Sequence, residues 1–511
     1  MKLYFEAEKF LKPNERAGSL QSRIFNDSKL SNSPKHIFAL VHSTLKYKEY
    51  IEMIIKKSKI KQGLQMKKLK ISDELLLLLV HDLVFSAKGR IQSGKHPIKD
   101  AFLQHQTRLQ AEFTKMKLKY RVKSASEFPT KEADEDETPI RWFRINTIKV
   151  ASPEKVFETN ELLKNLQPVN SIDDIKDTGF IYHDEYIPNL YGIHPREKLT
   201  STQAYIKGEV IIQDRASCFP GYILNQDSGD IHTEVIDACA APGNKTTHSA
   251  SFLPEDRSSV VYAFERDSKR VKILKTMCEK ATGKSKKELI QITHADFTTT
   301  RPDDFPNVTG FVVDPSCSGS GIFGRALEDS QKEEEKQQEI DTTRLNKLAG
   351  FQFKIVKHAL LFPSARKLVY STCSIHPHEN ERVVVDLLTD PEIKSRGWHL
   401  EDRSKVIPNW ERRGWKEEFT SIAGGDNEMC EKLAGGCVRS IPKEDGGIGF
   451  FAACFVRDNE KTQLEDNGGS EVRNGCCKPI TDASDKAQET SEEVAETSNT
   501  DTQAEWTGFN D

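Results

Sequence analysis

Residues 208–457 alternate short apolar runs with stretches that are long enough to form helices. The apolar runs lie at residues 235–238, 260–264, 311–313, 368–370 and 448–456. Uninterrupted apolar strands separated by helices are typical of a parallel sheet that is buried on both faces. We therefore predict an α/β fold with a doubly wound, Rossmann-like sheet over this part of the chain.

The first 127 residues show the spacing of helices instead. Apolar side chains recur at helical spacing between residues 33 and 57. A second helix is predicted from about residue 72 through residue 85, and a third over residues 102–118. We therefore expect a helical N-terminal domain over residues 1–127.

The formal net charge of the chain is −4, with 74 Lys and Arg residues against 78 Asp and Glu residues. This total conceals opposite charges, because residues 1–126 carry 26 basic and 11 acidic side chains, whereas residues 458–511 carry 4 basic and 14 acidic ones. The basic front favours a polyanionic partner. Its densest basic positions are Lys115, Lys117, Lys119, Arg121 and Lys123. Taken alone, these positions also fit a solvated helix face with cations at the negative end of the helix dipole.

An acidic run at residues 132–137 separates the helical region from a small α/β module that we predict over residues 138–207. The module is expected to contain a strand at 141–146 and a helix at 153–166. Residues 330–339, rich in Glu, Lys and Gln, are expected to form a solvent-facing insertion. The tail at 458–511 is polar and poor in aromatic residues, so we expect it to be disordered.

Several classes of protein are disfavoured. The longest aliphatic run, residues 75–80, is far shorter than the roughly 20 residues that cross a bilayer. The chain starts without an apolar secretion signal. Its ten cysteines include no CxxC pair, which predicts neither a disulfide framework nor a structural zinc site. We therefore expect an intracellular protein in a reducing compartment, without a metal and without membrane contact.

A run of small residues follows the first apolar run of the predicted sheet. Residues 237–247 read DACAAPGNKTT, and Gly243 would let the backbone approach a ligand where the next helix begins. The run is not a P-loop, because Asn244 separates Gly243 from Lys245, and it is not a GxGxxG motif. From the pattern alone, a tight turn and a ligand-binding loop fit it equally well.

Acidic side chains follow the next runs. Glu265 comes directly after residues 260–264, where a carboxylate could accept both hydroxyl protons of a ribose, and Arg270 lies about one helical turn further on. Asp296 is another acid at a predicted strand end. The alternative is that these acids belong to ordinary helix starts, with Asp267 as a cap.

Two cysteines occupy equivalent positions after later strands. Residues 314–321 read DPSCSGSG and follow the run at 311–313, and residues 371–374 read STCS and follow the run at 368–370. A lone buried cysteine usually serves as a small apolar side chain. Two at matching strand ends, Cys317 and Cys373, instead indicate thiol chemistry, for which a nucleophile must be partly exposed and have a lowered pKa.

Together these motifs strongly resemble the NSUN (Nop/Sun) family of RNA cytosine-5 methyltransferases. The resemblance rests on residues 237–247, 314–321 and 371–381 (STCSIHPHENE), and extends to QDRASC at 213–218, Arg144-Ile145-Asn146 and Gly449-Phe450-Phe451. It covers residues 140–457. The basic front looks like the extension of the family's fifth member, which methylates large-subunit ribosomal RNA.

The resemblance implies roles for individual residues. A loop would hold S-adenosylmethionine through Cys239, Ala240, Ala241, Pro242, Gly243, Asn244 and Lys245. Glu265, where the family more often has Asp, would bind the ribose, Asp296 the adenine side, and Arg270 matches the arginine after the ribose acid. Cys373 matches the nucleophile and Cys317 the second cysteine, which assists product release. Asp314 would lie near the methionine end of the cofactor or near the cytosine.

The implied function is methylation of carbon 5 of a cytosine in ribosomal RNA of the large subunit, through a covalent cysteine–carbon 6 adduct. A nuclear, nucleolar monomer active in ribosome biogenesis is expected. One alternative is a cytosine methyltransferase acting on another RNA, or on DNA through Cys317, although Pro315-Ser316-Cys317 and Thr372-Cys373 favour RNA. Another is a non-catalytic ribosome-assembly factor with the same fold.

Overall fold

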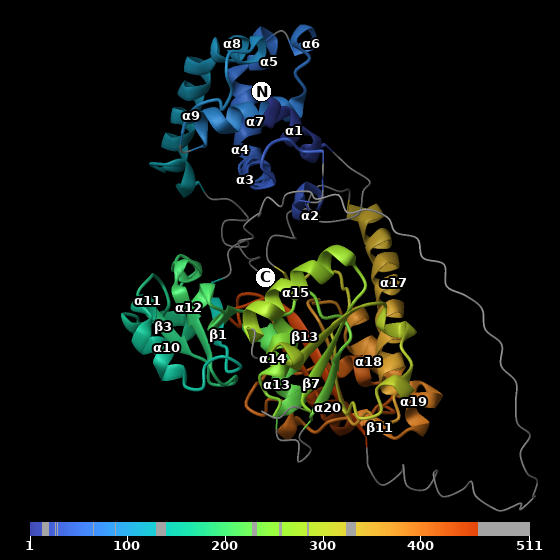
Figure 1. Ribbon diagram of the computed structural model, residues 1–511. Coiled ribbons are helices and arrows are strands. Elements are labelled where there is room, and N and C mark those ends of the chain that lie inside the picture. The colour runs from blue at the N-terminus through green and yellow to red at the C-terminus, as the bar shows by residue number, and fades with distance from the viewer. Residues whose placement is uncertain are drawn as a thin grey trace, which may run out of the picture. The chain divides into compact units, whose positions relative to one another are not determined.

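The computed structural model describes residues 1–12, 20–25, 27, 29–64, 66–86, 88–128, 139–226, 232–254, 258–283, 286–322 and 334–457. The acidic run at 132–137, the tail at 458–511 and the first part of the expected insertion lie outside the described residues. The described chain divides into two compact units (Figure 1). One consists of Met1–Pro139 and Gly319–Thr343, and the other of the remaining described residues.

The N-terminal part of the first unit consists of helices around one apolar core. They are α1 (Lys2–Leu11), α2 (Leu20–Phe25), α3 (Pro34–Lys46), α4 (Lys48–Ser58), α5 (Ile60–Gly63), α6 (Met66–Leu69), α7 (Asp73–Val84), α8 (Pro97–Leu103) and α9 (Gln106–Tyr120). Helix α7 is buried along most of its length, and Ser72 caps it by accepting a hydrogen bond from the Leu75 N–H at 2.9 Å. The helix predicted from residue 72 is thus confirmed. Among the described residues, no helix is long and apolar enough to span a membrane.

Two predicted helices have different bounds in the structure. Residues 33–57 form two helices, α3 and α4, which are separated by Tyr47. The Tyr47 ring is buried and stacks on Phe85, with 4.8 Å between ring centroids. The apolar spacing does not reveal this break, because both helices bury side chains in the same core. Helix α9 begins at Gln106 rather than near Phe102, which belongs to α8.

The second unit contains a small sheet with the strand order β2-β3-β4-β1-β5. Its strands are β1 (Arg141–Ile145), β2 (Gln167–Val169), β3 (Phe180–His183), β4 (Leu190–Ile193) and β5 (Val210–Ile212). The strand predicted at 141–146 is β1, and β5 extends the sheet past residue 207, where we had placed the end of the module. The single helix predicted at 153–166 is wrong: Asn160 separates α10 (Pro153–Thr159) from α11 (Glu161–Lys164), which it caps.

The same unit contains a larger sheet with the order β11-β13-β10-β9-β6-β7-β8, and β12 also pairs with β13. Its strands are β6 (Glu234–Asp237), β7 (Val260–Glu265), β8 (Ile290–His294), β9 (Gly310–Val313), β10 (Lys367–Thr372), β11 (Trp398–Leu400), β12 (Cys437–Ser440) and β13 (Phe450–Arg457). Strands β6 to β10 are parallel, whereas β13 is antiparallel to its neighbours. The predicted doubly wound sheet is confirmed; the antiparallel edge adds β11 and β12, which the sequence analysis did not predict.

Helices cover both faces of the large sheet (Figure 1). On one face lie α13 (Arg215–Asn225), α14 (Asn244–Ala250) and α15 (Ser268–Thr282), and on the other α17 (Glu334–Leu360) and α18 (Glu381–Thr389). Three shorter helices complete this unit: α12 (Gln203–Ile206), α19 (Pro391–Ser395) and α20 (Asn427–Gly435).

Two buried polar residues, in and just after β1, bond to the segments that flank β5 and to helices that cover the large sheet. Arg144, in β1, donates from Nε to Gln213 Oε1 at 2.7 Å and from Nη2 to Thr247 Oγ1, on α14, at 2.8 Å. Asn146, just after β1, donates to the carbonyls of Gly208 and Ala281, each at 2.8 Å. Buried polar groups require such partners, so the two sheets are joined by specific hydrogen bonds as well as by packing.

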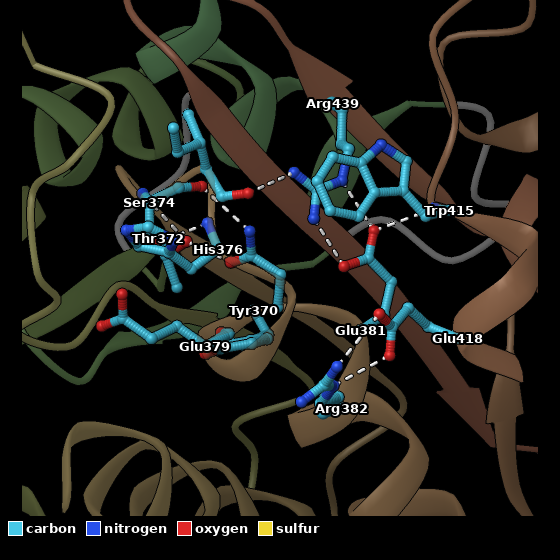
Figure 2. Close-up of polar contacts among 12 residues, drawn as sticks. Tyr370, Thr372, Ser374, His376, Glu379, Glu381, Arg382, Trp415, Glu418 and Arg439 are labelled. Carbon is cyan, nitrogen blue, oxygen red and sulfur yellow. Dashed lines mark hydrogen bonds and ion pairs between the residues drawn. The ribbon is translucent and has the colours of Figure 1, made fainter. Parts of the chain in front are cut away.

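A buried ion pair holds β12 against α18 at the antiparallel edge (Figure 2). Glu381, the first residue of α18, accepts from Nε and Nη2 of Arg439, in β12, each at 2.6 Å. The backbone N–H of Trp415 donates to the same carboxylate at 2.9 Å. Bidentate contacts of this type are among the strongest hydrogen bonds in proteins.

Replacing Glu381 with Ala should destabilise the protein strongly, because it leaves the Arg439 guanidinium buried without its counter-charge. Loss of one partner of a buried pair lowers the free energy of unfolding by about 3–5 kcal/mol. Urea unfolding of the full chain measures this loss. The matched control is Glu418→Ala, which breaks the more exposed ion pair with Arg382 and should change the free energy by at most about 1 kcal/mol. Equal effects of the two substitutions would contradict the assigned role of Glu381.

Candidate active site

The carboxyl ends of β6, β7, β9 and β10 lie along one edge of the large sheet, because these strands are parallel. Strands β6 and β9 are neighbours. From β6 the chain goes on to β7, on one flank of this pair, and from β9 to β10, on the other flank. In open α/β sheets such a reversal of strand order leaves a crevice in which ligands bind. Apart from Arg270 and Asp296, the site residues predicted from the sequence lie at the ends of these four strands, in the loops that follow them or, for Asn244 and Lys245, in the first turn of α14.

The loop after β6 is held by Asp237, the last residue of the strand. The buried Asp237 carboxylate accepts from Thr246 Oγ1 at 2.7 Å and from the Cys239 N–H at 3.3 Å. Gly243 has φ +117°, and a Cβ there would lie 3.2 Å from Leu274 Cδ1. Only glycine fits this position without strain. It lets the backbone just before α14 pass close to Leu274.

Glu265 and Arg270 lie together in the structure. The Arg270 guanidinium is 3.3 Å from Glu265 Oε2 and also donates to the Ala241 carbonyl at 2.6 Å. The backbone N–H of Asp267 donates to Glu265 Oε1 at 2.8 Å. Arg270 therefore connects the acid at the end of β7 to the loop after β6, which positions both.

Asp296 follows β8 and caps a short turn at Phe297–Thr299. Its Oδ1 accepts from the N–H and the hydroxyl of Thr298, at 3.0 and 2.8 Å. Its Oδ2 is 3.4 Å from the guanidinium of Arg266. The structure thus gives Asp296 a local capping role, and the predicted contact with adenine stays a prediction.

Lys245 and Asp314 form an ion pair between the start of α14 and the loop after β9. Lys245 Nζ is 2.9 Å from Asp314 Oδ2 and donates to Ser217 Oγ at 3.1 Å. The hydroxyl of Ser371, in β10, donates to Asp314 Oδ1 at 2.6 Å. Three segments that are far apart in the sequence therefore meet at one carboxylate.

The two predicted cysteines are in direct contact. Cys317 Sγ lies 2.7 Å from Cys373 Sγ, both thiols are free, and both residues are partly exposed. The hydrogen bond to Cys373 and burial raise the pKa of Cys317 well above its usual value. Cys317 therefore keeps its proton, while the assignment of Cys373 as the nucleophile, which the family resemblance implies, stays a prediction.

Buried polar residues that the sequence reasoning did not single out hold the two cysteine segments. Glu379 Oε1 accepts from the Ser318 N–H at 2.8 Å and from Gln352 Nε2 at 3.0 Å, and Gln352 also donates to the Ser316 carbonyl. Asn380 accepts from the Thr372 hydroxyl and donates to the Ser374 carbonyl, at 2.6 and 2.9 Å. Glu379 and Asn380 belong to the quoted motif at 371–381, but Gln352 lies mid-helix in α17 without a local signal.

Asp237 should make stability depend on pH. Burial raises the pKa of Asp237 from a usual value of 3.8 to about 6. Between these values the folded protein keeps a proton that the unfolded chain has released, so the free energy of unfolding falls as pH rises through this window. Asp237→Asn does not titrate, so its stability relative to the wild type should increase by about 3 kcal/mol between pH 4 and 7. Urea unfolding at a series of pH values tests this.

Asp267→Asn is the control for this experiment. Hydrogen bonding to the Arg270 N–H lowers the pKa of the exposed Asp267. The wild type should therefore gain stability relative to this variant as pH rises, which is the opposite sign. If the difference in unfolding free energy between the wild type and Asp237→Asn does not change with pH, the Asp237 carboxyl titrates in the folded protein as it does in the unfolded chain.

Comparisons with known proteins agree with this architecture. The family model of the NOL1/NOP2/Sun domain family member 5 N-terminal domain matches residues 35–128, and that of the 16S rRNA methyltransferase RsmB/F matches residues 222–456. The 25S rRNA (cytosine-C(5))-methyltransferase rcm1 of Schizosaccharomyces pombe is 40% identical over 86% of this chain and 88% of its own length. A mouse 28S rRNA (cytosine-C(5))-methyltransferase is 32% identical over the same shares.

A solved structure shows the same fold. The crystal structure of PH0851 matches 89% of this chain and 97% of its own, with a TM-score of 0.51 and 18% identity. The family resemblance inferred from the motifs is confirmed by the relatives, which the chain matches over most of their length. The chain therefore belongs to the NOL1/NOP2/Sun family of rRNA (cytosine-C5)-methyltransferases, in the group of its fifth member.

Proposed function

We propose that this protein methylates carbon 5 of a cytosine in large-subunit ribosomal RNA, with S-adenosylmethionine as the methyl donor. The observation that carries the proposal is the contact between Cys317 and Cys373, at the sheet edge that also bears the loop after β6. The relatives named as 25S and 28S rRNA methyltransferases support this choice of substrate.

The residues at the sheet edge fit S-adenosylmethionine. Gly243 leaves space for a close approach to the backbone, and Asn244 Oδ1 is buried without a partner in the described residues. We expect Glu265 to accept from the ribose hydroxyls and Asp296 to face the adenine, with Asp314, and its ion-pair partner Lys245, near the methionine end or the cytosine. Bound there, S-adenosylmethionine supplies an electrophilic methyl group to carbon 5 of the cytosine.

Cys373 activates the cytosine. Carbon 5 is a weak nucleophile until the Cys373 thiolate attacks carbon 6, forms a C–S bond and gives the ring enamine character. After methylation, loss of the carbon-5 proton to a base expels the Cys373 thiolate and restores the ring. The target base must first leave its stack, which requires least energy in an unpaired loop of RNA.

The neighbours of Cys373 assist these steps. Cys317 keeps its proton, and its S–H can donate to the departing Cys373 thiolate, which accounts for a role in product release. Activation of the ring also needs a hydrogen-bond donor near N3 of the cytosine. Lys245, which lies 2.9 Å from Asp314 Oδ2, offers an ammonium donor beside this carboxyl.

Substitution of the two cysteines should have different consequences. Cys373→Ala should lose methyl transfer by a factor on the order of 10⁴ and form no covalent adduct, because the nucleophile is gone. Cys317→Ala should still form the adduct and accumulate it, because release is slowed. Denaturing gels of the protein mixed with RNA and S-adenosylmethionine, followed by peptide mapping of the adduct, measure both effects.

The same assay separates the alternatives. With 5-fluorocytosine in RNA or in DNA, the proposal requires trapping on RNA through Cys373. Trapping on DNA through Cys317 would favour a DNA methyltransferase. Absence of S-adenosylmethionine binding in calorimetry would favour a non-catalytic ribosome-assembly factor.

We also propose that the helical domain at residues 1–127 binds the RNA backbone. Helix α9 carries Lys115, Lys117 and Lys119 on exposed or half-exposed positions. Lys115 pairs with Glu112 at 2.8 Å, while the Lys117 and Lys119 ammonium groups lie over aromatic rings at 5.3 and 5.2 Å from the ring centroids. These cations support docking of phosphates, since the surrounding region carries an excess of positive charge.

Neutralising these three lysines with Gln should weaken RNA binding and its dependence on salt. If each contacts one phosphate of single-stranded RNA, the slope of log K against log salt concentration should become shallower by about 2. Titration of the full chain with ribosomal RNA at several salt concentrations measures the slope. The Lys→Arg triple variant keeps the charge and should keep the slope. An unchanged slope in the Gln variant would contradict the docking role.

Nucleolar localisation and a place in ribosome biogenesis are inferred from the proposed substrate. The basic cluster at residues 56–61 could serve as a nuclear localisation signal. In the fold, Lys56 and Lys57 lie in the last turn of α4 and Lys59 caps it, so the cluster also fits the preference for cations at a helix C-terminus.

A further inference from the structure

Trp415 presents an aromatic ring at the surface of the second unit. The residue is 44% exposed, and it lies between an isolated β-bridge at Arg413 and the short turn Lys416–Phe419. The Arg439 guanidinium lies 3.8 Å from the centroid of the indole (Figure 2). Because Arg439 itself is buried, it backs one side of the ring, while the exposed part of the ring remains available to a ligand.

The backbone of Trp415 and the cation behind its ring share one partner. Glu381 accepts from the backbone N–H of Trp415 and pairs with the guanidinium of Arg439. One buried carboxylate therefore positions both the backbone that carries the ring and the cation behind it. A preorganised ring of this kind loses little conformational entropy when a ligand stacks on it.

The same arginine connects this ring to the nucleophile segment. Arg439 Nη1 donates to the Ile375 carbonyl at 3.0 Å, and Ile375 lies two residues after Cys373. Ile375 is itself 38% exposed, so a second apolar side chain is accessible on the segment that Arg439 contacts. Figure 2 shows Arg439 between Trp415 and the segment that begins at Ser374.

The charges around Trp415 favour a neutral ligand surface over a phosphate. Arg382 pairs with Glu418 at 2.9 Å and Lys416 with Glu431 at 2.8 Å, so nearby cations are balanced by carboxylates. A cytosine that leaves its stack to reach Cys373 deprives the neighbouring base of a stacking partner. Unpaired RNA bases are commonly held by stacking on aromatic side chains, which tolerate any sequence.

We propose that Trp415, backed by Arg439 and adjoined by Ile375, stacks an unpaired RNA base that neighbours the target cytosine. The inference rests on the proposed function and adds a second recognition site outside the reacting centre. Trp415 touches neither the reacting atoms nor the cofactor loop in this assignment; it positions the RNA so that the cytosine reaches Cys373.

The test combines variants with altered RNA. The methylated cytosine is first mapped by bisulfite sequencing of ribosomal RNA treated with the wild-type protein, and a short RNA fragment centred on it becomes the substrate. Trp415→Ala should lower kcat/KM by about 5- to 150-fold, the range expected for one stacked base. Trp415→Phe keeps an aromatic ring and should recover most of the activity. Met429→Ala removes an apolar side chain of similar exposure, 42%, on α20 and should have no effect.

Abasic substitutions in the RNA make the test independent of protein folding. In the wild type, removing one base next to the cytosine should lower kcat/KM as much as Trp415→Ala does. Trp415→Ala should show no further loss with that abasic RNA, because the two changes remove the same contact. Additive losses, or full activity of Trp415→Ala, would overturn the inference while leaving the methyltransferase proposal intact.

Two other outcomes also decide the question. If the wild type methylates no ribosomal RNA, the proposed function fails and this inference fails with it. If Trp415→Ala methylates naked RNA normally but no longer associates with pre-ribosomal particles, the ring binds a protein instead of a base.

Discussion

Strands β6 and β9 lie side by side in the large sheet, although β7 and β8 separate them along the chain. The segments that follow them leave the same edge, and Lys245, at the start of α14, meets Asp314, after β9, at 2.9 Å. Ser371, in the next strand, donates to the same carboxylate. The start of α14, the acid and the strand before Cys373 are therefore brought together by the topology of the sheet, which holds them on buried parallel strands.

The contact between the two thiols distinguishes residues that look equivalent in sequence. Two sulfurs 2.7 Å apart cannot both be ionised without strong repulsion, so one of them keeps a proton. The hydrogen bond to Cys373, burial, and the nearby carboxylates of Asp314 and Glu379 raise the pKa of Cys317, which favours its protonated form. The chemistry thus depends on the charges around each cysteine as well as on its place at a strand end.

The sequence revealed the features that depend on local residue patterns: the apolar runs of strands and the residues at strand ends. Apolar runs predicted β6, β7, β9, β10 and β13, and the parallel arrangement then implied that Cys317 and Cys373 would share an edge. It could not reveal contacts between distant segments, such as the pairing of Glu381 with Arg439 or the bonds from Gln352 to the segment around Cys317. Nor could it place the break at Tyr47 or the pairing of β5 with β1, because tertiary packing decides both.

The hydrogen bonds of Arg144 bear on whether the large sheet is an autonomous folding unit. Its buried guanidinium donates to Gln213, just after β5, and to Thr247, on α14, and both residues are buried. A polypeptide beginning at residue 208 would lack this donor and also β1, against which β5 pairs. It would expose an unpaired strand edge and leave buried acceptors unsatisfied, each at a cost of about 1–3 kcal/mol. Although the two sheets are separate hydrogen-bonded structures, they should therefore fold and unfold as one cooperative body.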